Sequence, residues 1–320
     1  MTTWDTYYRG DGVIREDVTL PAPPPWRTFP RQTEATVFQP PEGLIDAVNA
    51  ALCLRRPLMI TGAPGSGKST VIDQVAAELG LGRVLRWHIT SRSTLTDALY
   101  RYDALGRIHA HRLRQDSHDQ SRSTSRAVDD IAPFLQLGQL GTALLPAGRP
   151  RALLIDEIDK CDLDLPGDLL DVLERGEFRI AELLREGQAE AEVRMWDSDR
   201  KHTIVNGHVQ CTEFPFIVMT SNGEQELSPP FLRRCVRYEM PAPTVALLRD
   251  VVRAHLQIDT EPSEPLTELL QDFVRRIAAG ESVAVDQLLS AIHLLSGERS
   301  PQGSQRERLV ALLMRDLSHA

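Results

Sequence analysis

Short apolar runs alternate with stretches of helical spacing between about residue 57 and residue 240. The apolar runs, each of strand length, cover residues 57–61, 83–90, 151–159, 214–222 and 235–240. Between them, "KSTVIDQVAAELG" and "LPGDLLDVLERGEF" carry apolar residues at the spacing of a helix. Strands that alternate with helices are typical of a parallel sheet covered on both faces. We therefore predict an α/β domain with five parallel strands in an αβα arrangement.

The flanking regions have different patterns. Residues 1–40 include "LPAPPPWRTFP", a proline-rich extension that favours neither a helix nor an inner strand. A helix is predicted to begin near Pro40 and Pro41 and to lead into the α/β domain over 41–240. After Pro241 four helical stretches follow, which predict a separate all-helical lid domain over 241–320.

Two stretches interrupt the α/β pattern. Residues 92–150 are long for a connection between strands, and the polar segment 114–126 within them predicts a mobile loop. Residues 181–212 alternate around "DSDRKH" and "NG", a pattern typical of a β-hairpin. We interpret both as inserts in the α/β domain.

Composition narrows the function classes. The chain has 320 residues, 42% apolar and 25% charged, as in ordinary soluble proteins. No apolar run approaches the 18 residues of a membrane span, and the first residues do not resemble a signal peptide, so we expect a cytoplasmic protein without a membrane partner. The net charge of −9 argues against a nucleic-acid partner bound by a broad basic face. Four scattered cysteines indicate buried thiols better than a zinc site or disulfides.

The clearest chemical motif is "GAPGSGKS", which follows a predicted strand and opens a predicted helix. Its glycines let the backbone wrap a polyphosphate, while Lys68 reaches the β- and γ-phosphates and the Ser69 hydroxyl ligates Mg²⁺. The cofactors expected are therefore ATP and Mg²⁺. The nucleotide-binding residues predicted from this motif are Gly62, Ala63, Pro64, Gly65, Ser66, Gly67, Lys68, Ser69 and Thr70.

Polar residues also follow two of the later strands. Asp156 and Glu157 end "ALLIDE", where Asp156 would hold the nucleotide's Mg²⁺ and Glu157 would polarise the attacking water. Carboxylates also favour the start of a helix, which is the alternative for this pair. Asn222 ends "IVMTSN" and is a candidate to orient that water, although a simple turn asparagine fits the same pattern. Arg233 and Arg234 follow Asn222 along the chain. Considered without the other motifs, a pair of arginines is most often solvated surface charge.

In this order, the motifs resemble those of the AAA+ ATPases. "GAPGSGKST" is similar to their Walker A motif, "LLIDEIDK" to Walker B, "TSN" to sensor 1 and "FLRRC" to the arginine-finger segment. The two inserts make the chain similar to the MoxR-like group in particular. The resemblance covers residues 40–300 and leaves the first 40 unexplained.

The resemblance implies a ring, usually of six subunits, in which an arginine of one subunit reaches the γ-phosphate held by the next. Arg234 is our first candidate for that finger and Arg233 the alternate. The family's second-sensor arginine is missing, because Ala284 and Val285 occupy its expected place. The resemblance also places adenine recognition near Ile45 and Val48, for which core packing is an equally good interpretation.

These features support two functional hypotheses above others. The first is a ring-forming ATPase that remodels or activates a partner protein in the manner of a chaperone, with a von Willebrand A-type or effector-domain protein as a candidate partner. The second is an ATP-controlled assembly switch or scaffold in signalling or antiphage defence. A P-loop kinase for small molecules is less consistent with the carboxylate pair, Asn222 and the helical lid.

Overall fold

The computed structural model describes residues 7–8, 10–14, 20–28, 38, 40–116, 130–196, 198–256, 264–279, 281, 283–296 and 300–315. The chain forms two compact units. The first contains residues 1–39, 62–70 and 240–320, and the second contains residues 40–61 and 71–239. The glycine-rich loop is therefore grouped with the C-terminal helices. Most of the segments predicted as a proline-rich extension and a mobile loop lie outside the described residues.

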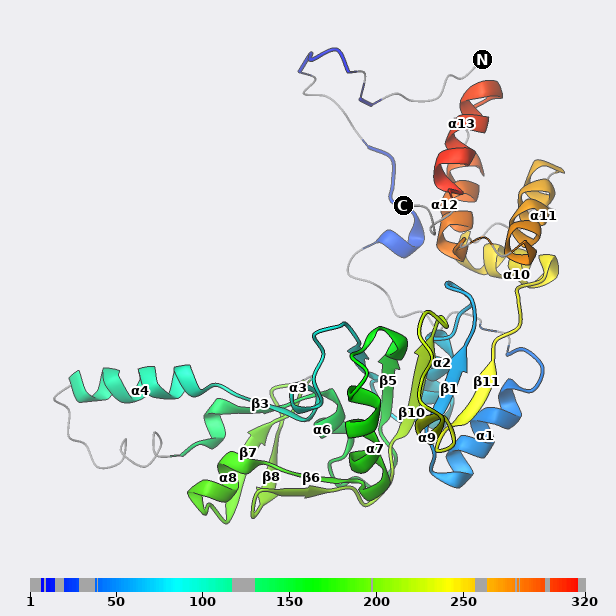
Figure 1. Ribbon diagram of the computed structural model, residues 1–320. Coiled ribbons are helices and arrows are strands. Elements are labelled where there is room, and N and C mark those ends of the chain that lie inside the picture. Colours follow the sequence, from blue (N-terminus) through cyan, green and yellow to red (C-terminus); the bar gives the residue numbers. More distant parts are fainter. Residues whose placement is uncertain are drawn as a thin grey trace. The chain divides into compact units, whose positions relative to one another are not determined.

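A five-stranded parallel sheet forms the centre of the second unit, with the strand order β2-β5-β10-β1-β11 (Figure 1). Its strands are β1 (Leu58–Thr61), β2 (Leu85–His88), β5 (Ala152–Asp156), β10 (Phe216–Ser221) and β11 (Val236–Glu239). All six residues of β10 are buried, whereas the edge strands β2 and β11 alternate between more and less exposed residues. This is the pattern expected when only the inner strands are covered on both faces. The predicted fold class is confirmed.

Helices cover this sheet. Helix α1 (Leu44–Leu54) contacts β1 and β11, and α6 (Gln139–Ala143) contacts β2 and β5. The remaining helices of this part are α2 (Thr70–Leu79), α3 (Leu95–Leu99), α7 (Leu165–Arg175), α8 (Ala181–Glu186) and α9 (Pro229–Leu232). Within α1, Val48 is buried but Ile45 is 59% exposed, so Ile45 is not part of the core.

The two inserts, together with β6 just before the second of them, form a second sheet with the order β3-β4-β7-β8-β9-β6. Its strands are β3 (Tyr100–Tyr102), β4 (Leu135–Leu137), β6 (Glu177–Arg179), β7 (Glu190–Arg194), β8 (Lys201–Val205) and β9 (His208–Gln210). Strands β7 and β8 pair antiparallel over five residues, as the alternation in this insert predicts. The two inserts therefore fold together, because β4 of the first pairs with β7 of the second.

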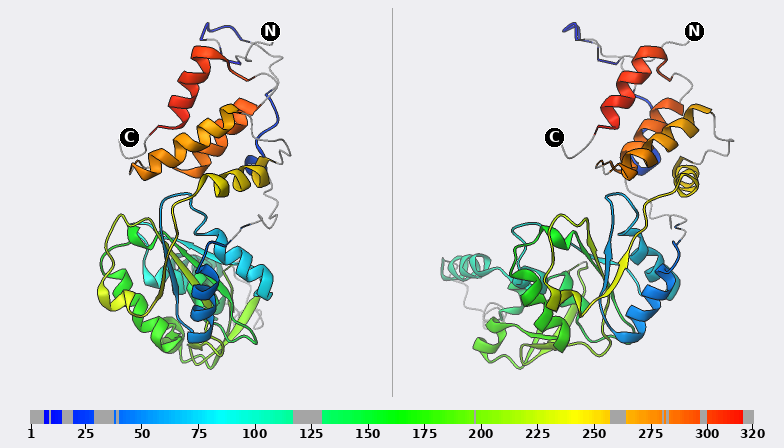
Figure 2. Two further views of the ribbon diagram at one scale, coloured as in Figure 1. Left: turned by 90° about the vertical axis from the view of Figure 1, so that its right-hand side faces the viewer. Right: turned by 45° about the vertical axis from the view of Figure 1, so that its right-hand side comes forward.

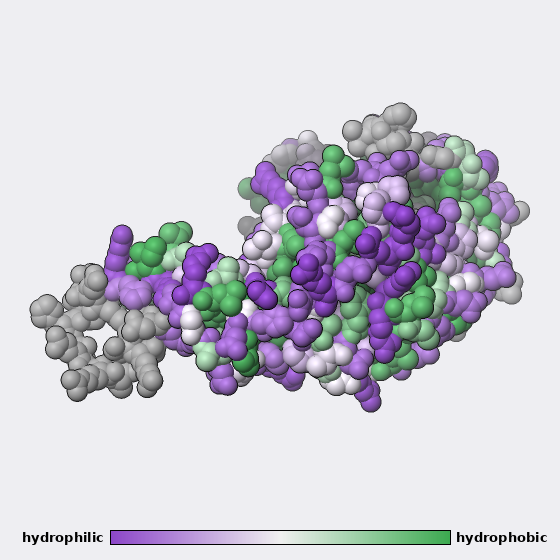
Figure 3. All heavy atoms as spheres, turned by 60° about the horizontal axis from the view of Figure 1, so that its bottom comes forward, coloured by the Kyte–Doolittle hydropathy of each residue, from purple (hydrophilic) through white to green (hydrophobic). Residues whose placement is uncertain are grey.

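Helix α4 (Ala104–Asp116) lies in the first insert and projects from the second unit (Figure 1). The polar segment predicted as a loop begins at residue 114, but the helix continues to Asp116, so that boundary was wrong. Its apolar side chains Leu105, Ile108 and Leu113 are all exposed. The projecting helix thus carries exposed apolar side chains. Over most of the face of the molecule drawn in Figure 3, hydrophilic and hydrophobic residues are mixed.

The described C-terminal part of the first unit is helical. It contains α10 (Val245–Leu256), α11 (Glu264–Ala278), α12 (Val285–Ser296) and α13 (Gly303–Leu313), coloured yellow to red in Figure 2. Leu270, Phe273 and Leu288 lie at the centre of its core and are fully buried. Near its start the chain forms a short 3-10 turn, Pro25–Arg27, which contacts α10. The exact domain boundaries stay a prediction.

Candidate active site

The glycine-rich loop that follows β1 has little room for side chains at three positions. Gly62 has φ +147°, and a Cβ atom on it would lie 2.9 Å from Met240 Cβ. Gly65 has φ +73°, and a Cβ atom on it would lie 2.7 Å from the backbone nitrogen of Val285. Gly67 has φ +83°, and its Cβ would lie 3.2 Å from the ring of Phe38. Glycine adopts such a backbone without steric cost, and the absence of a side chain leaves the N–H groups accessible. The backbone at these positions therefore requires glycine.

Two polar groups of this loop fit the phosphates of a nucleotide. The ammonium group of Lys68 is 7% exposed and donates to the carbonyl oxygens of Gly62 at 2.7 Å and Ala63 at 2.8 Å. The Ser66 hydroxyl is buried and has no hydrogen-bond partner among the described residues. A buried polar atom without a partner is costly. A cation and an unpaired donor in a glycine cradle together suit an oligophosphate.

The two carboxylates occupy a strained turn at the carboxyl end of β5. Asp156 is the last residue of the strand, and Glu157 follows in the left-handed region with φ 60° and ψ 50°. This backbone costs a non-glycine residue about 1 kcal/mol. The buried Thr220 on β10 holds the turn, since its hydroxyl donates to Asp156 Oδ1 at 2.6 Å and accepts the Glu157 N–H at 2.9 Å. Strained residues that neighbouring groups hold in place are frequent at functional sites.

Asn222 is fixed beside this turn by a residue that the sequence analysis did not select. Asp159 is 2% exposed, and its Oδ2 atom accepts the backbone N–H groups of Asn222 and Glu224, each at 3.0 Å. The Asn222 side chain lies near Glu157, with 3.5 Å between Nδ2 and Oε1. Asn222 and Glu157 are thus brought together as predicted.

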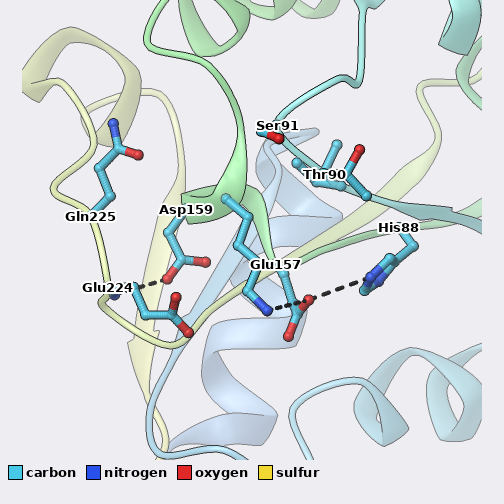
Figure 4. Close-up of a pocket in the computed structure, with 9 residues that line it drawn as sticks. His88, Thr90, Ser91, Glu157, Asp159, Glu224 and Gln225 are labelled. Atoms are coloured by element: carbon cyan, nitrogen blue, oxygen red, sulfur yellow. Dashed lines mark hydrogen bonds and ion pairs between the residues drawn. The ribbon is translucent and has the colours of Figure 1, made fainter. Parts of the chain in front are cut away.

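The carboxylate of Glu157 also has two basic neighbours. Its Oε2 atom lies 3.0 Å from Lys160 Nζ and 3.5 Å from His88 Nε2. The hydrogen bond to Glu157 is the main cause that raises the pKa of Lys160. In Figure 4, Glu157 and His88 point toward one another, with Asp159 and Glu224 on one side. The position of Glu157 is therefore set by contacts from β2, β10 and its own turn.

A cavity of about 550 Å³ opens beside these groups. It is lined by His88, Ile89, Thr90, Ser91, Glu157, Asp159, Lys160, Glu224 and Gln225 (Figure 4). No arginine is among these lining residues, so the positive charge at this cavity comes from Lys160 and, when protonated, His88.

The oxygen donors predicted for Mg²⁺ suit that ion. Asp156 offers a carboxylate that is 29% exposed, and Ser69 offers a hydroxyl at the start of the helix after the glycine-rich loop. Among the residues that the structure describes, no group of three or more histidine, cysteine or acidic side chains could hold a metal ion. Magnesium is commonly held by only one or two protein oxygens together with substrate phosphates and water. The donor set fits Mg²⁺ that arrives with a nucleotide.

The two candidate arginines lie just after α9 and have different surroundings. Arg234 is tied to α7, since its Nε atom lies 2.6 Å from Glu174 Oε1, and it also donates to the carbonyl of Pro230. Arg233 is exposed; its backbone N–H donates to the Pro229 carbonyl at 3.1 Å, and its guanidinium group pairs with no residue that the structure describes. Neither contacts Glu157, whose described partners are Thr220, Asn222, His88 and Lys160.

The expected place of the second-sensor arginine also contacts the glycine-rich loop. A side chain on Gly65 would meet the backbone of Ala284 and Val285, where α12 begins. Both of these residues, Ala284 and Val285, have apolar side chains. No arginine from this turn reaches the loop in the described part of the helical unit.

Four contributors to the site were missed from sequence: His88, Asp159, Lys160 and Thr220. Asp159 and Lys160 lie within the same acidic motif, and Thr220 lies within "TSN", so their proximity to the chosen residues was a usable signal. His88 ends β2, and it meets Glu157 because β2 pairs with β5. That pairing depends on strand order, which the sequence analysis did not assign.

A phosphate-binding loop after the first strand, with a carboxylate pair and an asparagine at the ends of neighbouring parallel strands, defines a P-loop ATPase. The family model for the AAA domain of the dynein-related subfamily matches residues 57–235. The chain belongs to this family and is an AAA-domain ATPase. Use of ATP and Mg²⁺ is general in the family.

Other comparisons show less. None of the curated proteins matches the chain. Two solved structures of RuvB variants from Thermotoga maritima are similar at 15% and 17% identity, with TM-scores of 0.40 and 0.41. These matches cover 84% and 85% of this chain but 65% and 67% of the RuvB chains, so this chain spans about two thirds of their length. None of the described helices is long and apolar enough to cross a membrane.

Proposed function

We propose that the chain is a ring-forming ATPase of the MoxR-like kind that uses ATP hydrolysis to remodel or activate a partner protein. Bound ATP with Mg²⁺ would supply the γ-phosphate for hydrolysis. Lys68 and the loop N–H groups would hold its phosphates, and Ser69 and Asp156 would supply protein oxygens to the ion. Glu157 would polarise the water, with Asn222 to orient it.

One observation supports an active site that is shared between two copies of the chain. The contacts of Glu157 and the lining of its cavity include no arginine, whereas two exposed arginines follow α9. Stabilisation of γ-phosphoryl charge by an arginine from a second molecule is worth several orders of magnitude in rate. We infer that Arg233 or Arg234 acts in the site of a neighbouring copy, in the six-membered ring that the resemblance implies. Because Arg234 is already paired with Glu174, the geometry makes Arg233 an equal candidate.

A protein partner is supported by α4. The exposed Leu105, Ile108 and Leu113 give this projecting helix an apolar character that association with another protein would cover. A von Willebrand A-type or effector-domain protein would be a partner consistent with the resemblance.

Mixed assemblies test the shared site. The double variant Arg233→Ala/Arg234→Ala lacks the finger, and Glu157→Gln lacks the water-polarising group, so each should be inactive alone. Mixed at assembling concentrations, they should recover hydrolysis, because a Glu157 subunit can sit beside an arginine-bearing neighbour. The matched control is Arg175→Ala on α7, whose guanidinium pairs with Asp171 at the surface. Failure to recover activity in a mixture that assembles would exclude the shared site.

The Lys160–Glu157 ion pair favours a second candidate, the ATP-controlled assembly switch. Lys160 Nζ occupies one oxygen of the Glu157 carboxylate at 3.0 Å, so turnover could be withheld until assembly changes this contact. Counting phosphate released per assembly event separates the two: about one per subunit supports a switch, and continued release in the presence of a partner supports remodelling.

A further inference from the structure

One buried carboxylate oxygen beside the candidate active site has no partner. Asp159 is 2% exposed, and its Oδ2 atom accepts two backbone N–H groups. Its Oδ1 atom is also buried, but has no hydrogen-bond partner among the described residues. A buried charged oxygen without a partner is costly, so its presence in a folded protein calls for an explanation. Asp159 lines the cavity at Glu157, so a donor at that cavity could supply the missing bond (Figure 4).

The cation nearest to Asp159 along the chain is Lys160. Both residues belong to a single 3-10 turn, Ile158–Lys160, and the Lys160 N–H donates to the Glu157 carbonyl at 2.9 Å. The pKa of Lys160 is raised, first by its hydrogen bond to Glu157, while the charges of Glu224 and Asp159 act in the same direction. The ammonium group therefore stays protonated and lies within the electrostatic influence of all three carboxylates.

In the structure this ammonium group is held by Glu157. Lys160 Nζ lies 3.0 Å from Glu157 Oε2, and the two side chains are 40% and 24% exposed. Ion pairs that water can reach contribute little to stability. A lysine side chain is also a flexible four-carbon stem, so Nζ can leave Glu157 while the backbone of the 3-10 turn stays in place. This contact can be exchanged for another at low cost.

Each carboxylate oxygen of Glu157 already has a polar neighbour. Its Oε1 atom lies 3.5 Å from Asn222 Nδ2, and its Oε2 atom lies near both Lys160 and His88. A water that Glu157 polarises needs access to one of these oxygens. Of the three neighbours, Lys160 has the longest flexible side chain, and it follows directly on Asp159, whose Oδ1 atom is unpaired. Lys160 is therefore the contact best able to open.

We propose that Lys160 is a positioning residue with two alternative acceptors: it holds Glu157 Oε2 while hydrolysis is withheld, and it moves to Asp159 Oδ1 when Glu157 takes up the attacking water. The move gives the buried oxygen of Asp159 a charged donor. Burial of an ammonium group costs free energy, which accounts for Glu157 being the resting acceptor. The inference rests on the proposed catalytic role of Glu157, but the exchange itself can be measured without ATP.

Acetylation of lysines in the absence of nucleotide tests the exchange. The chain has only three lysines, Lys68, Lys160 and Lys201, so peptide mass spectrometry after treatment with limiting acetic anhydride reports each one. Glu157→Gln removes the charge that holds Lys160. Lys160 should then move to the buried carboxylate, and its acetylation rate relative to the exposed Lys201 should fall at least about 5-fold, because a charge-assisted bond protects the amine.

Two further variants, made in the Glu157→Gln protein, identify the acceptor. Asp159→Asn should raise the acetylation rate of Lys160 at least to its value in the original protein. Glu224→Gln removes another acidic group of the same cavity and should leave the protection in place. A rate that rises or stays unchanged in Glu157→Gln would overturn the exchange, as would protection that survives Asp159→Asn.

Steady-state hydrolysis tests whether the exchange controls catalysis. Lys160→Met removes the resting contact, so kcat should rise about 2- to 5-fold, the range expected for a water-accessible ion pair, with ATP affinity unchanged. A merely structural role would make kcat fall. Lys160→Arg keeps the charge and should keep the original rate, and Lys201→Met is the matched control. An unchanged or lower kcat in Lys160→Met would overturn the positioning role. Normal hydrolysis by Glu157→Gln would instead refute the proposed role of Glu157, and the acetylation rates would still decide the exchange.

Discussion

The Oδ2 atom of Asp159 accepts the backbone N–H of Asn222 at 3.0 Å, and this carboxylate is almost completely buried. It also accepts the N–H of Glu224. One side chain from the acidic motif therefore fixes the turn that carries the asparagine, and the position of Asn222 relative to Glu157 depends on it.

Replacing Asp159 should reduce catalysis more than nucleotide binding. Asp159→Ala removes the carboxylate acceptor of two N–H groups, which should lower the free energy of unfolding by about 1–3 kcal/mol. ATP hydrolysis should fall at least about 10-fold, while equilibrium binding of a fluorescent ATP analogue changes little. Asp159→Asn retains an accepting oxygen and should restore part of the activity. The exposed Asp168→Ala serves as control. Full activity in folded Asp159→Ala would show that Asn222 needs no such support.

Lys68→Ala should abolish nucleotide binding. The ammonium group is the only side-chain cation in the glycine-rich loop, and losing its charge-assisted bonds to phosphate should weaken ATP at least about 100-fold. Affinity is measured by calorimetry. Lys201→Ala, on the exposed face of β8, is the matched control. Retained binding in a folded Lys68→Ala protein would refute the phosphate-loop assignment.

Glu157→Gln should separate binding from hydrolysis. The amide keeps the size of the side chain but cannot take a proton, so turnover should fall by about 100-fold or more with ATP affinity preserved. The assembled, ATP-bound form should accumulate and can be followed by light scattering. Glu224→Gln, which lines the same cavity, controls for the loss of charge. Unchanged hydrolysis in Glu157→Gln would rule out its catalytic role.

The cysteines should differ in reactivity toward iodoacetamide at pH 8. Burial raises the pKa of Cys161 and of Cys235 to about 11, so roughly one in a thousand of these thiols is ionised at that pH. Cys53 is exposed and should be labelled first. Peptide mass spectrometry over time reports each site, and all four should react in denaturant. Native labelling of Cys235 as fast as Cys53 would contradict its burial.

Features that contiguous residues form could be predicted from the sequence. The glycine-rich loop is recognisable because Gly65, Gly67 and Lys68 act through backbone spacing, and β10 is recognisable because a strand covered on both faces is continuously apolar. The acidic pair and Asn222 were found for the same reason: each directly follows an apolar run.

Contacts between distant segments could not be found in this way. His88 meets Glu157 only because β2 is the neighbour of β5. The pairing of Arg234 with Glu174 joins two exposed side chains 60 positions apart, which no local pattern encodes.

Strand β5 joins the two ends of this unit by only five residues, Ala152–Asp156. At about 3.3 Å per residue, the five steps from Arg151, which precedes the strand, to Asp156 span about 16 Å. Strand β5 is hydrogen-bonded to a neighbour on each side, β2 and β10. A shift of β5 along its axis would displace Asp156 and Glu157 together, so contacts at the amino end of this strand bear on the alignment of the carboxylate pair at its other end.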